Sequence, residues 1–510
     1  MQLSLLMRGI EPLGVTRPPD GDVASVCYDS RQCRPGSLFV AIPGLKADGR
    51  AFIADAADRG ARFVVHEGDL LPPAGVTAIR VRDSRRALGI LGKNLFGDPS
   101  SGIRLIAVVG TNGKTTVTYL IESILRAAGH SVGVLGTVNY RYGGKMFPAP
   151  NTTPESFELQ RIIREMADSG VTYVAMEVSS HAIDLKRVDD CAFDLGVFTN
   201  LTQDHLDYHE TMENYFQAKR RFFAEVLPAG KKDRPRKMIV NTDDPWGRRI
   251  LGEIGLGRLT YGIDTPGDVT ASPFHLTLHG VEALLRLDGE GLAIASPLIG
   301  KFNLSNILAA AAAAFELGIP GTSIRDGIAA LTHVPGRLER VGAAGEPAVF
   351  VDYAHTDDAL RRVLENLASF RTGRIITVFG CGGDRDRGKR PLMGEAASAA
   401  SDLAIVTSDN PRTEDPREII RQIEAGIRTT RFADAGEWSR HPGASGYIVI
   451  VDRKEAIAAA IALADAADIV LIAGKGHEDY QIIGQQKFPF DDRVIARAEL
   501  ARRESGGDGS

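Results

Sequence analysis

Short runs of continuous apolar residues, each followed by a segment with helical spacing, recur along most of the chain. A strand buried on both faces of a sheet is apolar throughout, whereas an amphipathic helix repeats its apolar residues every three to four positions. Residues 104–130 show this unit clearly, as an apolar run, a glycine-rich turn and an amphipathic helix. The same alternation predicts further strands at 171–180, 193–201, 237–244, 374–380, 402–408, 447–452 and 468–474. The pattern predicts an α/β protein with largely parallel sheets.

Two segments rich in glycine and proline divide this alternation. "FGDPSSGI" at 96–103 follows two strand-like runs, at 36–42 and 62–68, and "HVPGRLER" at 333–340 marks a second boundary. A chain of 510 residues is too long for a single core. With about 150 residues per domain as a guide, the chain should form three domains. We predict domains at residues 1–100, 101–335 and 336–510.

Composition narrows the class of protein. The chain is 44% hydrophobic and 25% charged, as is usual for soluble globular proteins, and its net charge of -5 does not favour nucleic-acid binding. It has no apolar run long enough to span a membrane, and the first residues lack the basic start of a signal peptide. Four cysteines without a CxxC pair are expected to be reduced thiols with no zinc site: Cys27, Cys33, Cys191 and Cys381. We therefore expect a cytoplasmic protein that binds neither nucleic acid nor membrane.

The seven residues "GTNGKTT" at 110–116 carry the strongest functional signal. Glycines let backbone N–H groups close around phosphate, and the start of the following helix favours an anion. Lys114 would neutralise a transferring phosphoryl group, and the Thr115 hydroxyl would reach a Mg²⁺ ion. The usual pattern has glycine where this chain has Val108, so the loop is a shortened variant. We predict nucleotide binding by Gly110, Thr111, Asn112, Gly113, Lys114, Thr115 and Thr116.

Charged side chains follow two other strands of the central domain. Glu177 lies near the end of "YVAMEVSSH", where it is either a Mg²⁺ ligand beside the phosphate loop or a solvated acid. "TNLTQDHLDYH" at 199–209 carries two aspartates and two histidines, either in a metal site or in a polar loop. Lys219 lies in an amphipathic segment, 215–223, where a solvated lysine is the ordinary interpretation.

The loop "TSDNPRTEDP" at 407–416 follows the apolar run "DLAIV". It places an Asp, an Asn and an Arg around a proline that stiffens the turn. In open α/β sheets, ligands bind outside the carboxyl ends of the strands. This loop is therefore either an ordinary turn or a ligand-binding segment.

Nine short motifs, in order along nearly the whole chain, resemble those of the Mur ligases, ATP-dependent enzymes that form amide bonds in bacterial peptidoglycan synthesis. They are "GTNGKTT", "NTTP" (151–154), "EVSSHA" (177–182), "TNLTQDHLDYH", "YFQAK" (215–219), "KFNLSN" (301–306), "PGRLE" (335–339), "DYAHT" (352–356) and "GKGHE" (474–478). In addition, "DNPR" at 409–412 is similar to the signature of the members that add meso-diaminopimelate. The resemblance implies an N-terminal α/β UDP-sugar-binding domain, a central P-loop ATPase, and a C-terminal Rossmann-like domain for the incoming amino acid.

The resemblance also implies a reaction. ATP would phosphorylate the D-Glu carboxylate of UDP-N-acetylmuramoyl-L-Ala-D-Glu, and the amine of meso-diaminopimelate would attack the acyl phosphate. Lys219 would carry a CO2-derived carbamate and help to hold a second Mg²⁺, with Glu177 and His205 supporting the metals. The expected catalytic residues are Lys114, Lys219 and His205, and the expected metal ligands are Thr115, Glu177, His205 and Lys219. We expect the protein to be a monomer.

The resemblance places the two other substrates on further residues. Asn303 would contact adenine, and Arg337 and Asp352 would contact the phosphate and ribose side of the nucleotide. The segment "YDSRQ" at 28–32 resembles the uridine-binding segment of the family. The expected contacts of the UDP-sugar-dipeptide are Ser30, Leu45, Lys46, Ala47, Asn151, Thr152, Thr153, Ser179 and Arg187.

Meso-diaminopimelate differs from lysine by one carboxylate, at the end far from the reacting amine. A planar guanidinium can bind that group through two parallel hydrogen bonds, which an ammonium cannot imitate. We therefore predict that Arg412, held by Pro411, binds the distal carboxylate. Further contacts are expected from Arg390, Asp409, Asn410, Gly474 and Glu478.

Two positions depart from the family pattern, with Leu185 where glutamine is common and Asp357 where proline is usual. We expect the helix at Asp357 to start regardless, because aspartate is a good capping residue. Two alternatives with the same fold are an L-lysine-adding ligase and a folylpolyglutamate synthetase. An alternative of another class is a regulatory P-loop ATPase, which would turn over ATP without a sugar-peptide.

Overall fold

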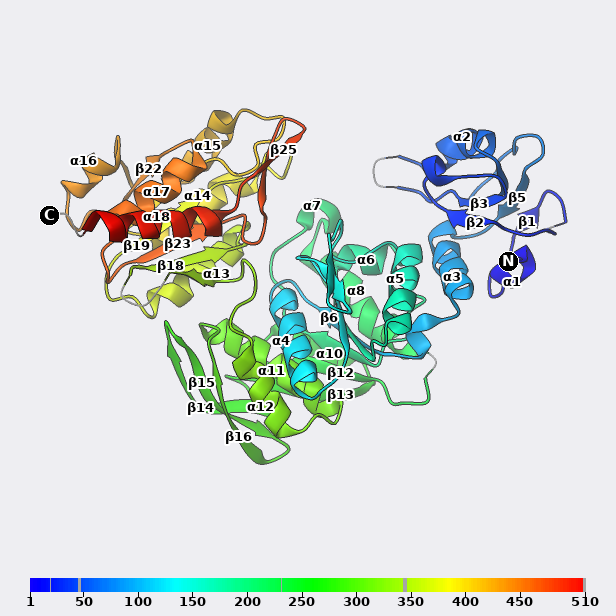
Figure 1. Ribbon diagram of the computed structural model, residues 1–510, viewed down its shortest axis with the longest axis horizontal. Coiled ribbons are helices and arrows are strands. Elements are labelled where there is room, and N and C mark those ends of the chain that lie inside the picture. Colours follow the sequence, from blue (N-terminus) through cyan, green and yellow to red (C-terminus); the bar gives the residue numbers. More distant parts are fainter. Residues whose placement is uncertain (19, 45–46, 231, 343–345, 508–510) are drawn as a thin grey trace. The chain divides into compact units, whose positions relative to one another are not determined.

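A computed structural model of the chain (Figure 1) describes residues 1–18, 20–44, 47–230, 232–342 and 346–507. The chain divides into two compact units. Unit 1 consists of Met1–Leu201, Thr211–Thr270 and Ala309–Gly327. Unit 2 consists of Thr202–Glu210, Ala271–Leu308 and Ile328–Ser510. Leu45 and Lys46, expected beside the uridine group, lie outside the described residues.

The first hundred residues of unit 1 form a five-stranded sheet in the order β1-β5-β4-β3-β2, parallel except for β1. The strands predicted at 36–42 and 62–68 are confirmed as β3 and β4. Leu38 and Val40 of β3 face one apolar cluster, whereas Phe39 faces another, so the sheet is covered on both faces. The elements are α1 (Leu3–Leu6), β1 (Gly14–Val15), β2 (Ser25–Cys27), β3 (Ser37–Val40), α2 (Ile53–Asp58), β4 (Ala61–His66), β5 (Thr77–Arg80) and α3 (Ser84–Phe96).

The rest of unit 1 is built on a second sheet, which contains the run of neighbouring strands β13-β12-β11-β6-β10-β7-β8-β9. The strands from β13 to β7 are parallel, as predicted from their continuous apolar runs, and β8 and β9 add an antiparallel edge. The strands are β6 (Arg104–Val109), β7 (Val132–Leu135), β8 (Tyr140–Tyr142), β9 (Lys145–Phe147), β10 (Tyr173–Val178), β11 (Leu195–Phe198), β12 (Lys237–Asn241) and β13 (Gly257–Gly262). The helices between them are α4 (Lys114–Ala127), α5 (Ser156–Asp168), α6 (Ser180–Asp184), α8 (Met212–Arg221), α9 (Leu227–Ala229) and α10 (Pro245–Glu253).

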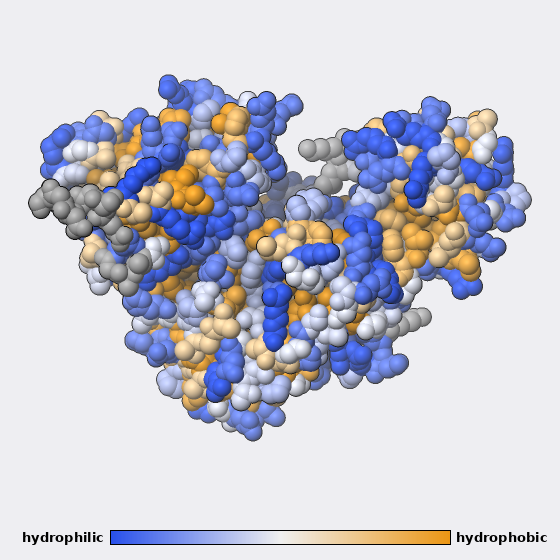
Figure 2. Space-filling view, viewed as in Figure 1, coloured by the Kyte–Doolittle hydropathy of each residue, from blue (hydrophilic) through white to orange (hydrophobic). Residues whose placement is uncertain are grey.

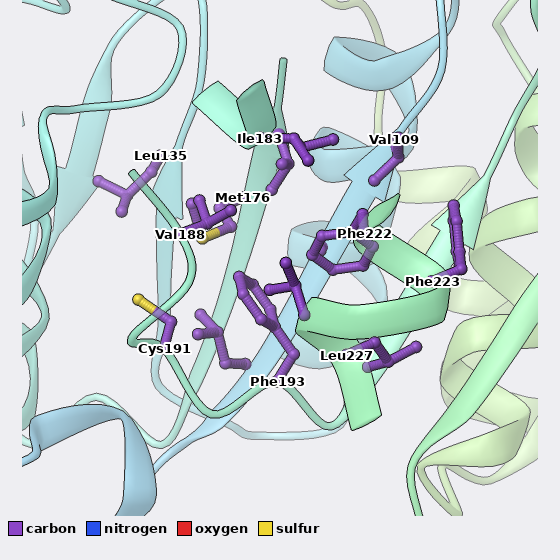
Figure 3. Close-up of a cluster of buried hydrophobic side chains, with 14 of the residues drawn as sticks. Val109, Leu135, Met176, Ile183, Val188, Cys191, Phe193, Phe222, Phe223 and Leu227 are labelled. Atoms are coloured by element: carbon purple, nitrogen blue, oxygen red, sulfur yellow. The ribbon is translucent and has the colours of Figure 1, made fainter. Parts of the chain in front are cut away.

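An apolar core packs against this second sheet (Figure 3). Val109 of β6 and Met176 of β10 share it with Phe222 and Phe223, which begin the π-helix Phe222–Val226 that continues α8. All four side chains are fully buried. Because Val109 directly precedes the glycine-rich turn and Lys219 lies one turn before Phe223, this core fixes both the phosphate loop and the helix that carries Lys219.

Three strands between residues 269 and 296 were not predicted. β14 (Val269–Thr277) is followed by β15 (Gly280–Leu287) and β16 (Glu290–Ser296), which pair antiparallel. Buried and exposed residues alternate along much of β15, because one of its faces meets solvent. A search for continuous apolar runs misses such strands. The alanine-rich helix α11 (Lys301–Glu316) and then α12 (Gly321–Ala330) follow these strands.

The C-terminal part of unit 2 is a seven-stranded sheet in the order β17-β18-β23-β19-β20-β22-β21, parallel except for β17. Alternate residues of each strand enter two different cores: Ile469 and Leu471 of β23 face the side of α13 to α15, and Val470 and Ile472 face the side of α16 to α18. The strands are β17 (Glu339–Val341), β18 (Ala348–Asp352), β19 (Ile375–Phe379), β20 (Leu403–Val406), β21 (Thr430–Arg431), β22 (Gly446–Val449) and β23 (Ile469–Ala473). The helices are α13 (Asp357–Ala368), α14 (Lys389–Ala400), α15 (Pro416–Glu424), α16 (Ala435–Ser439), α17 (Arg453–Leu463) and α18 (Asp492–Gly507). The four strands predicted here are confirmed.

A two-stranded ribbon, β24 (Tyr480–Ile483) and β25 (Gln486–Pro489), follows β23 and exposes Ile483 and Phe488. Figure 2 shows that much of the visible face is hydrophilic, with apolar residues in scattered groups. Within the described ranges, no helix has the length and apolar character needed to cross a membrane.

Candidate functional site

The phosphate loop lies between β6 and α4, as predicted. Gly113 is the N-cap of α4 and has a φ of 84°, a left-handed conformation that glycine adopts without strain. The ammonium of Lys114 donates to the carbonyl oxygens of Gly110 (2.9 Å) and Thr111 (2.8 Å). The loop thus presents a helix start and a cation on the same short segment, the arrangement that binds phosphate.

The residues after β11 hold this loop. The Thr199 hydroxyl donates to the carbonyl of Asn112 (2.7 Å), and the N–H of Asn112 donates to the side-chain oxygen of Asn200 (2.9 Å). A Cβ at Gly110 would lie 1.9 Å from the Thr199 hydroxyl oxygen, so only glycine fits there. The sequence drew attention to the acids and histidines of 199–209, whereas Thr199 and Asn200 make the structural contacts with the loop.

Lys219 is a buried lysine beside the phosphate loop, with only 1% of its surface exposed. Its ammonium donates to the carbonyl of Gly110 (2.8 Å) and lies 4.4 Å from the centre of the Tyr215 ring. The Tyr215 hydroxyl is in turn 3.1 Å from the hydroxyl of Thr111. A solvated lysine is therefore the wrong interpretation of this position.

Glu177 is also buried and is fixed by Thr137. Its two carboxylate oxygens accept hydrogen bonds from the N–H and the hydroxyl of Thr137, both at 2.9 Å. In the parallel register Glu177 lies opposite Val108, two residues before the loop begins. The interpretation as a solvated acid is excluded, since 1% of Glu177 is exposed.

The described residues contain no group of three or more His, Cys, Asp or Glu side chains that is ready to hold a metal ion. The carboxylate of Glu177 and the buried hydroxyl of Thr115 are nevertheless the oxygen donors that Mg²⁺ prefers, so both fit such an ion. His205 belongs to unit 2, has a φ of 53°, and lies 3.4 Å from the carboxylate of Asp204. Its grouping with the residues of unit 1 stays a prediction.

The segment expected to hold the muramoyl-dipeptide is tied to the end of β10. The Thr153 hydroxyl donates to the carbonyl of Glu177 (2.9 Å) and accepts from the N–H of Ser179 (3.1 Å). Arg187 donates to the carbonyl of Thr153 (3.1 Å). Asn151 accepts from Tyr140 through its carbonyl, and the Thr152 hydroxyl lies 3.1 Å from that of Thr137. Thr153, Ser179 and Arg187 therefore share one network, as the prediction requires.

Glu155 and Arg85 extend this network to the N-terminal domain, which the sequence did not indicate. The Glu155 carboxylate lies 3.2 Å from Arg187 and 3.3 Å from Arg85 of α3. Arg85 also donates to the carbonyl of Pro43 (2.5 Å), just before the segment expected at the uridine. Ser30 is buried in the 3₁₀ turn Ser30–Gln32, whereas Ala47 is exposed.

A cavity of about 170 Å³ lies within unit 2 and is lined by both Asn303 and Arg337. Its walls combine apolar side chains, Leu298 and Ile299, with the polar side chains of His333 and Glu339. The Asn303 amide donates to the carbonyl of Ile299 (2.9 Å). A cavity with both apolar and polar walls can receive a flat heterocycle that has hydrogen-bonding edges.

Asp352 and Arg337 are joined through one turn. The Asp352 carboxylate accepts from the N–H groups of Leu338 (2.6 Å) and Ala354 (2.8 Å), and burial raises its pKa. The Arg337 guanidinium lies 4.7 Å from the ring centre of Tyr353, which also packs against His477 at 5.0 Å. Asp352 thus shapes the turn that carries Arg337.

The loop 409–412 follows β20, as predicted, and Arg412 has an uncommon backbone. Its φ is 51°, its N–H donates to the carbonyl of Ile482 (3.1 Å), and its carbonyl accepts from the N–H of Gly484 (2.7 Å). The guanidinium donates to the carbonyl of Gly383 (2.7 Å). A left-handed arginine fixed by the β24–β25 ribbon is no ordinary solvated turn residue, and such strain is frequent at ligand sites.

Lys475 and Gln481 hold the same loop and were not predicted. The fully buried ammonium of Lys475 donates to the side-chain oxygen of Asn410 (3.0 Å) and lies 3.3 Å from Glu478. Glu478 accepts from the Asn410 amide (2.8 Å), and burial raises its pKa. Gln481 donates to the carbonyl of Asp409 (2.7 Å). "GKGHE" was recognised as a motif, but its spacing does not reveal which residue the lysine contacts.

Arg390 is buried, and Glu414 takes up much of its hydrogen-bonding capacity. Its guanidinium donates to the Glu414 carboxylate at 2.8 and 3.0 Å and to the carbonyl of Gly382 (3.2 Å). The hydrogen bond from Arg390 lowers the pKa of Glu414 to about 2. Glu414 was not predicted, although it lies two residues beyond Arg412.

Two further expectations concern departures from the family pattern. The helix after "DYAHT" begins at Asp357 as expected, but the capping oxygen belongs to Thr356, which accepts from the N–H of Ala359 (3.3 Å). Asp357 lies in the first turn, where its negative charge interacts favourably with the positive end of the helix dipole. Leu185 is the C-cap of α6 and precedes Lys186, whose φ is 56°. Gly474, which follows β23, lies close to Asp409, since a Cβ there would be 2.8 Å from the Asp409 carboxylate.

Comparison with known proteins gives matches in all three predicted domains. "Mur ligase family, catalytic domain" matches residues 22–95, "Mur ligase middle domain" matches 108–314, and "Mur ligase, glutamate ligase domain" matches 336–476. These segments fall inside the predicted domains, whose limits at 100 and 335 stay predictions.

Full-length relatives and solved structures agree. The chain is 47% identical over 511 residues to UDP-N-acetylmuramoyl-L-alanyl-D-glutamate–2,6-diaminopimelate ligase of Geobacter metallireducens, and the match covers 100% of both chains. It is 48% identical over 509 residues to the enzyme of that name from Geobacter sulfurreducens, and this match covers 99% of this chain and 100% of the relative. A solved structure of an enzyme of that name has a TM-score of 0.69 at 33% identity and covers 99% of both chains. MurF ligase of Thermotoga maritima in complex with ADP shares the fold, with a TM-score of 0.62 at 18% identity over 94% of this chain and 98% of that one. The chain belongs to the Mur ligase family.

Proposed function

We propose that this Mur ligase adds meso-diaminopimelate to the D-Glu residue of UDP-N-acetylmuramoyl-L-Ala-D-Glu, with ATP as co-substrate, in peptidoglycan precursor synthesis. The observation that carries the proposal is the backbone of Arg412, which is fixed in a left-handed conformation by both its N–H and its carbonyl. This holds a guanidinium at the carboxyl ends of the parallel strands. The names of the 47% and 48% identical relatives support the same amino acid.

The chemistry begins with activation of a carboxylate, which is a poor acyl donor. The γ-phosphoryl group of ATP passes to the D-Glu carboxylate, and Lys114 and the N–H groups of residues 110–116 stabilise the charge on the transferring group. The free amine then attacks the acyl carbon, and phosphate leaves from the tetrahedral intermediate. The carbonyl oxygen of Gly110 accepts hydrogen bonds from both Lys114 and Lys219, so the two lysines are held next to each other at the phosphate loop.

Mg²⁺ would be held by Thr115, Glu177, His205 and a carbamate on Lys219, and it would supply positive charge next to the phosphates. Carbamylation would convert a cation that repels Mg²⁺ into an anion that binds it. The position of Lys219 supports this proposal, because its buried side-chain nitrogen lies 2.8 Å from the Gly110 carbonyl of the phosphate loop. Glu177 supports it through a carboxylate that Thr137 already orients.

The nucleotide and the UDP-linked substrate would occupy the networks described above. Asn303, Arg337 and the cavity they line would receive the adenosine part of ATP, with Asp352 holding the turn. Ser30, residues 45–47, Asn151–Thr153, Ser179 and Arg187 would bind the UDP-sugar-dipeptide. We assign these sites to domains 1–100, 101–335 and 336–510, and we propose a monomer that works in the cytoplasm.

Arg412 would select the amino acid. The distal carboxylate of meso-diaminopimelate would accept two hydrogen bonds from the Arg412 guanidinium. These would replace the hydrogen bond that the guanidinium donates to the carbonyl of Gly383. Glu478, whose pKa is raised by burial, would accept the distal ammonium near Asn410 and Gly474, and Arg390 would add positive charge. Lysine lacks the distal carboxylate and would leave Arg412 desolvated and unpaired.

The experiment is a phosphate-release assay with UDP-N-acetylmuramoyl-dipeptide, ATP and either meso-diaminopimelate or L-lysine. We expect phosphate release that depends on both the sugar-dipeptide and meso-diaminopimelate. Release with L-lysine at an equal rate would identify a lysine-adding ligase, and release with ATP alone would identify a regulatory ATPase.

A further inference from the structure

Two cysteines lie at the ends of the turn that carries Ser30. Cys27 ends β2 and is 3% exposed, whereas Cys33 follows the turn Ser30–Gln32 and is partly exposed. Their sulfur atoms are 2.8 Å apart. The sulfurs of a disulfide are separated by about 2.05 Å, so a movement of only about 0.8 Å would join them.

The two thiols differ in their surroundings. The hydrogen bond from Cys27 lowers the pKa of the Cys33 thiol, whereas that contact and burial raise the pKa of Cys27. Asp29 and Asp55 oppose the thiolate of Cys33, and Arg59 favours it. The more accessible sulfur is therefore also the better nucleophile, as in reactive thiol pairs.

We propose that Cys27 and Cys33 form a reversible dithiol–disulfide site that reacts with low-molecular-weight disulfides such as oxidised glutathione. The Cys33 thiolate attacks one sulfur of the reagent, forms a mixed disulfide and releases one thiolate. Cys27 then loses its proton and attacks the Cys33 sulfur, which releases the second thiolate. Two cysteine thiols are oxidised, and the reagent is reduced to two thiols.

The disulfide closes a ring, residues 27–33, that contains Ser30. Within that ring the N–H of Cys33 donates to the carbonyl of Ser30 (3.0 Å), so a shift of Cys33 is transmitted to Ser30. Oxidation therefore changes the affinity for the UDP-linked substrate and leaves the affinity for ATP unchanged. This second part rests on the proposed function, which places uridine at Ser30, whereas disulfide formation does not.

The other cysteines provide a built-in comparison. Cys191 and Cys381 are both buried, and burial raises the pKa of each thiol, that of Cys381 to about 12. Neither should react with oxidised glutathione in the folded protein. All four residues are cysteines, so the expected difference in reactivity between Cys27 and Cys33 on one side and Cys191 and Cys381 on the other comes from their surroundings.

The test is incubation of the full chain with oxidised glutathione, followed by intact mass measurement and peptide mapping. We expect loss of two hydrogens and a peptide pair joined through Cys27 and Cys33, both reversed by dithiothreitol. Cys27→Ser should instead keep one glutathione on Cys33, because the second thiol is gone, and Cys191→Ser should behave as the wild type. A stable glutathione adduct on wild-type Cys33, or no reaction at either residue, would overturn the proposal.

The second measurement compares KM values of the reduced and oxidised enzyme. We expect the KM for the UDP-linked substrate to change by roughly threefold or more, with the KM for ATP unchanged. Cys33→Ser should show no effect of the oxidant. If the mass shows that the enzyme is oxidised but the KM for the UDP-linked substrate is unchanged, the link to Ser30 is overturned and disulfide formation still stands. Inactivity of the reduced enzyme with all three substrates would instead count against the proposed function.

Discussion

The phosphate loop and the loop 409–412 both follow a buried parallel strand, but they are held by different ranges of the chain. Lys114 donates to carbonyls three and four residues before it, so seven consecutive residues already contain the cation and the turn. Asn410 and Asp409 are held instead by Lys475 and Gln481, 65 and 72 residues further on. The first loop can be identified from a short motif. The second acquires its shape only when β20 and β23 lie in one sheet.

The largest expected effect concerns the buried lysine beside the phosphate loop. Lys219→Ala should lower the rate of phosphate release by roughly 10³–10⁵-fold, as loss of key phosphoryl-transfer groups does. Intact mass of the wild type should show the added mass of one CO2, and short carboxylic acids should partly restore the variant. The matched control is Lys145→Ala in exposed β9. Full activity of Lys219→Ala would mean that the phosphate loop works without this residue.

The second prediction separates the two loops through the fully buried Lys475. Lys475→Met keeps an unbranched side chain of similar bulk, one atom shorter, and leaves Glu478 and Asn410 without the ammonium. We expect the KM for meso-diaminopimelate to rise roughly 30-fold or more, because one partner of a buried charged contact is lost. The KM for ATP should stay within error, which also shows that the variant is folded. Lys454→Met, at an exposed position of α17, is the control. Equal changes in both KM values would remove the distinction between the loops.

The fold could be predicted where the information is local. Parallel strands such as β19 and β20 are continuous apolar runs, and "GTNGKTT" contains its own turn and cation. The strands β15 and β16 were missed because one of their faces is exposed, which gives no continuous run. Lys475 and Glu155 were missed for another reason: their partners, Asn410 and Arg85, are 65 and 70 residues away. The pairing of Cys27 with Cys33 likewise follows from the turn between them and not from a spacing rule.

The third prediction tests how far the phosphate loop depends on a hydrogen bond from Thr199, which lies outside residues 110–116. Thr199→Val removes the hydroxyl that donates to Asn112 and keeps the shape of the side chain. Loss of one such bond costs about 1 kcal/mol, so the KM for ATP should rise roughly fivefold. Thr172→Val, which removes an exposed hydroxyl bond to Ser131, should have no effect on it. A loss as large as that of Lys219→Ala would show that the motif alone does not form the loop.

The smallest effect is a pH dependence in unit 2. Burial, together with Arg337, Arg493 and His355, lowers the pKa of His477 to about 3. As the pH falls below about 6.5, the unfolded chain takes up a proton at His477, whereas the folded chain does so only near pH 3. The neutral His477 therefore leaves the free energy of unfolding at its full value above pH 6.5, and that free energy decreases as the pH falls towards 3. The unfolding temperature of unit 2 should fall by a few degrees between pH 7 and pH 5. His477→Asn should weaken that slope, and an identical slope would show that His477 is protonated in the folded chain.

The central claim is that Arg412 selects the amino acid, and the preference of Arg412→Ala for meso-diaminopimelate over L-lysine tests it most directly. The measured quantity is the ratio of kcat/KM for the two amino acids, with ATP and the UDP-linked substrate saturating. A guanidinium that the bound amino acid desolvates without supplying a carboxylate costs about 2–5 kcal/mol, which corresponds to a preference of roughly 30-fold to several thousand-fold. The account predicts that Arg412→Ala loses this preference while the KM for ATP stays unchanged. A variant that keeps the wild-type ratio would contradict it.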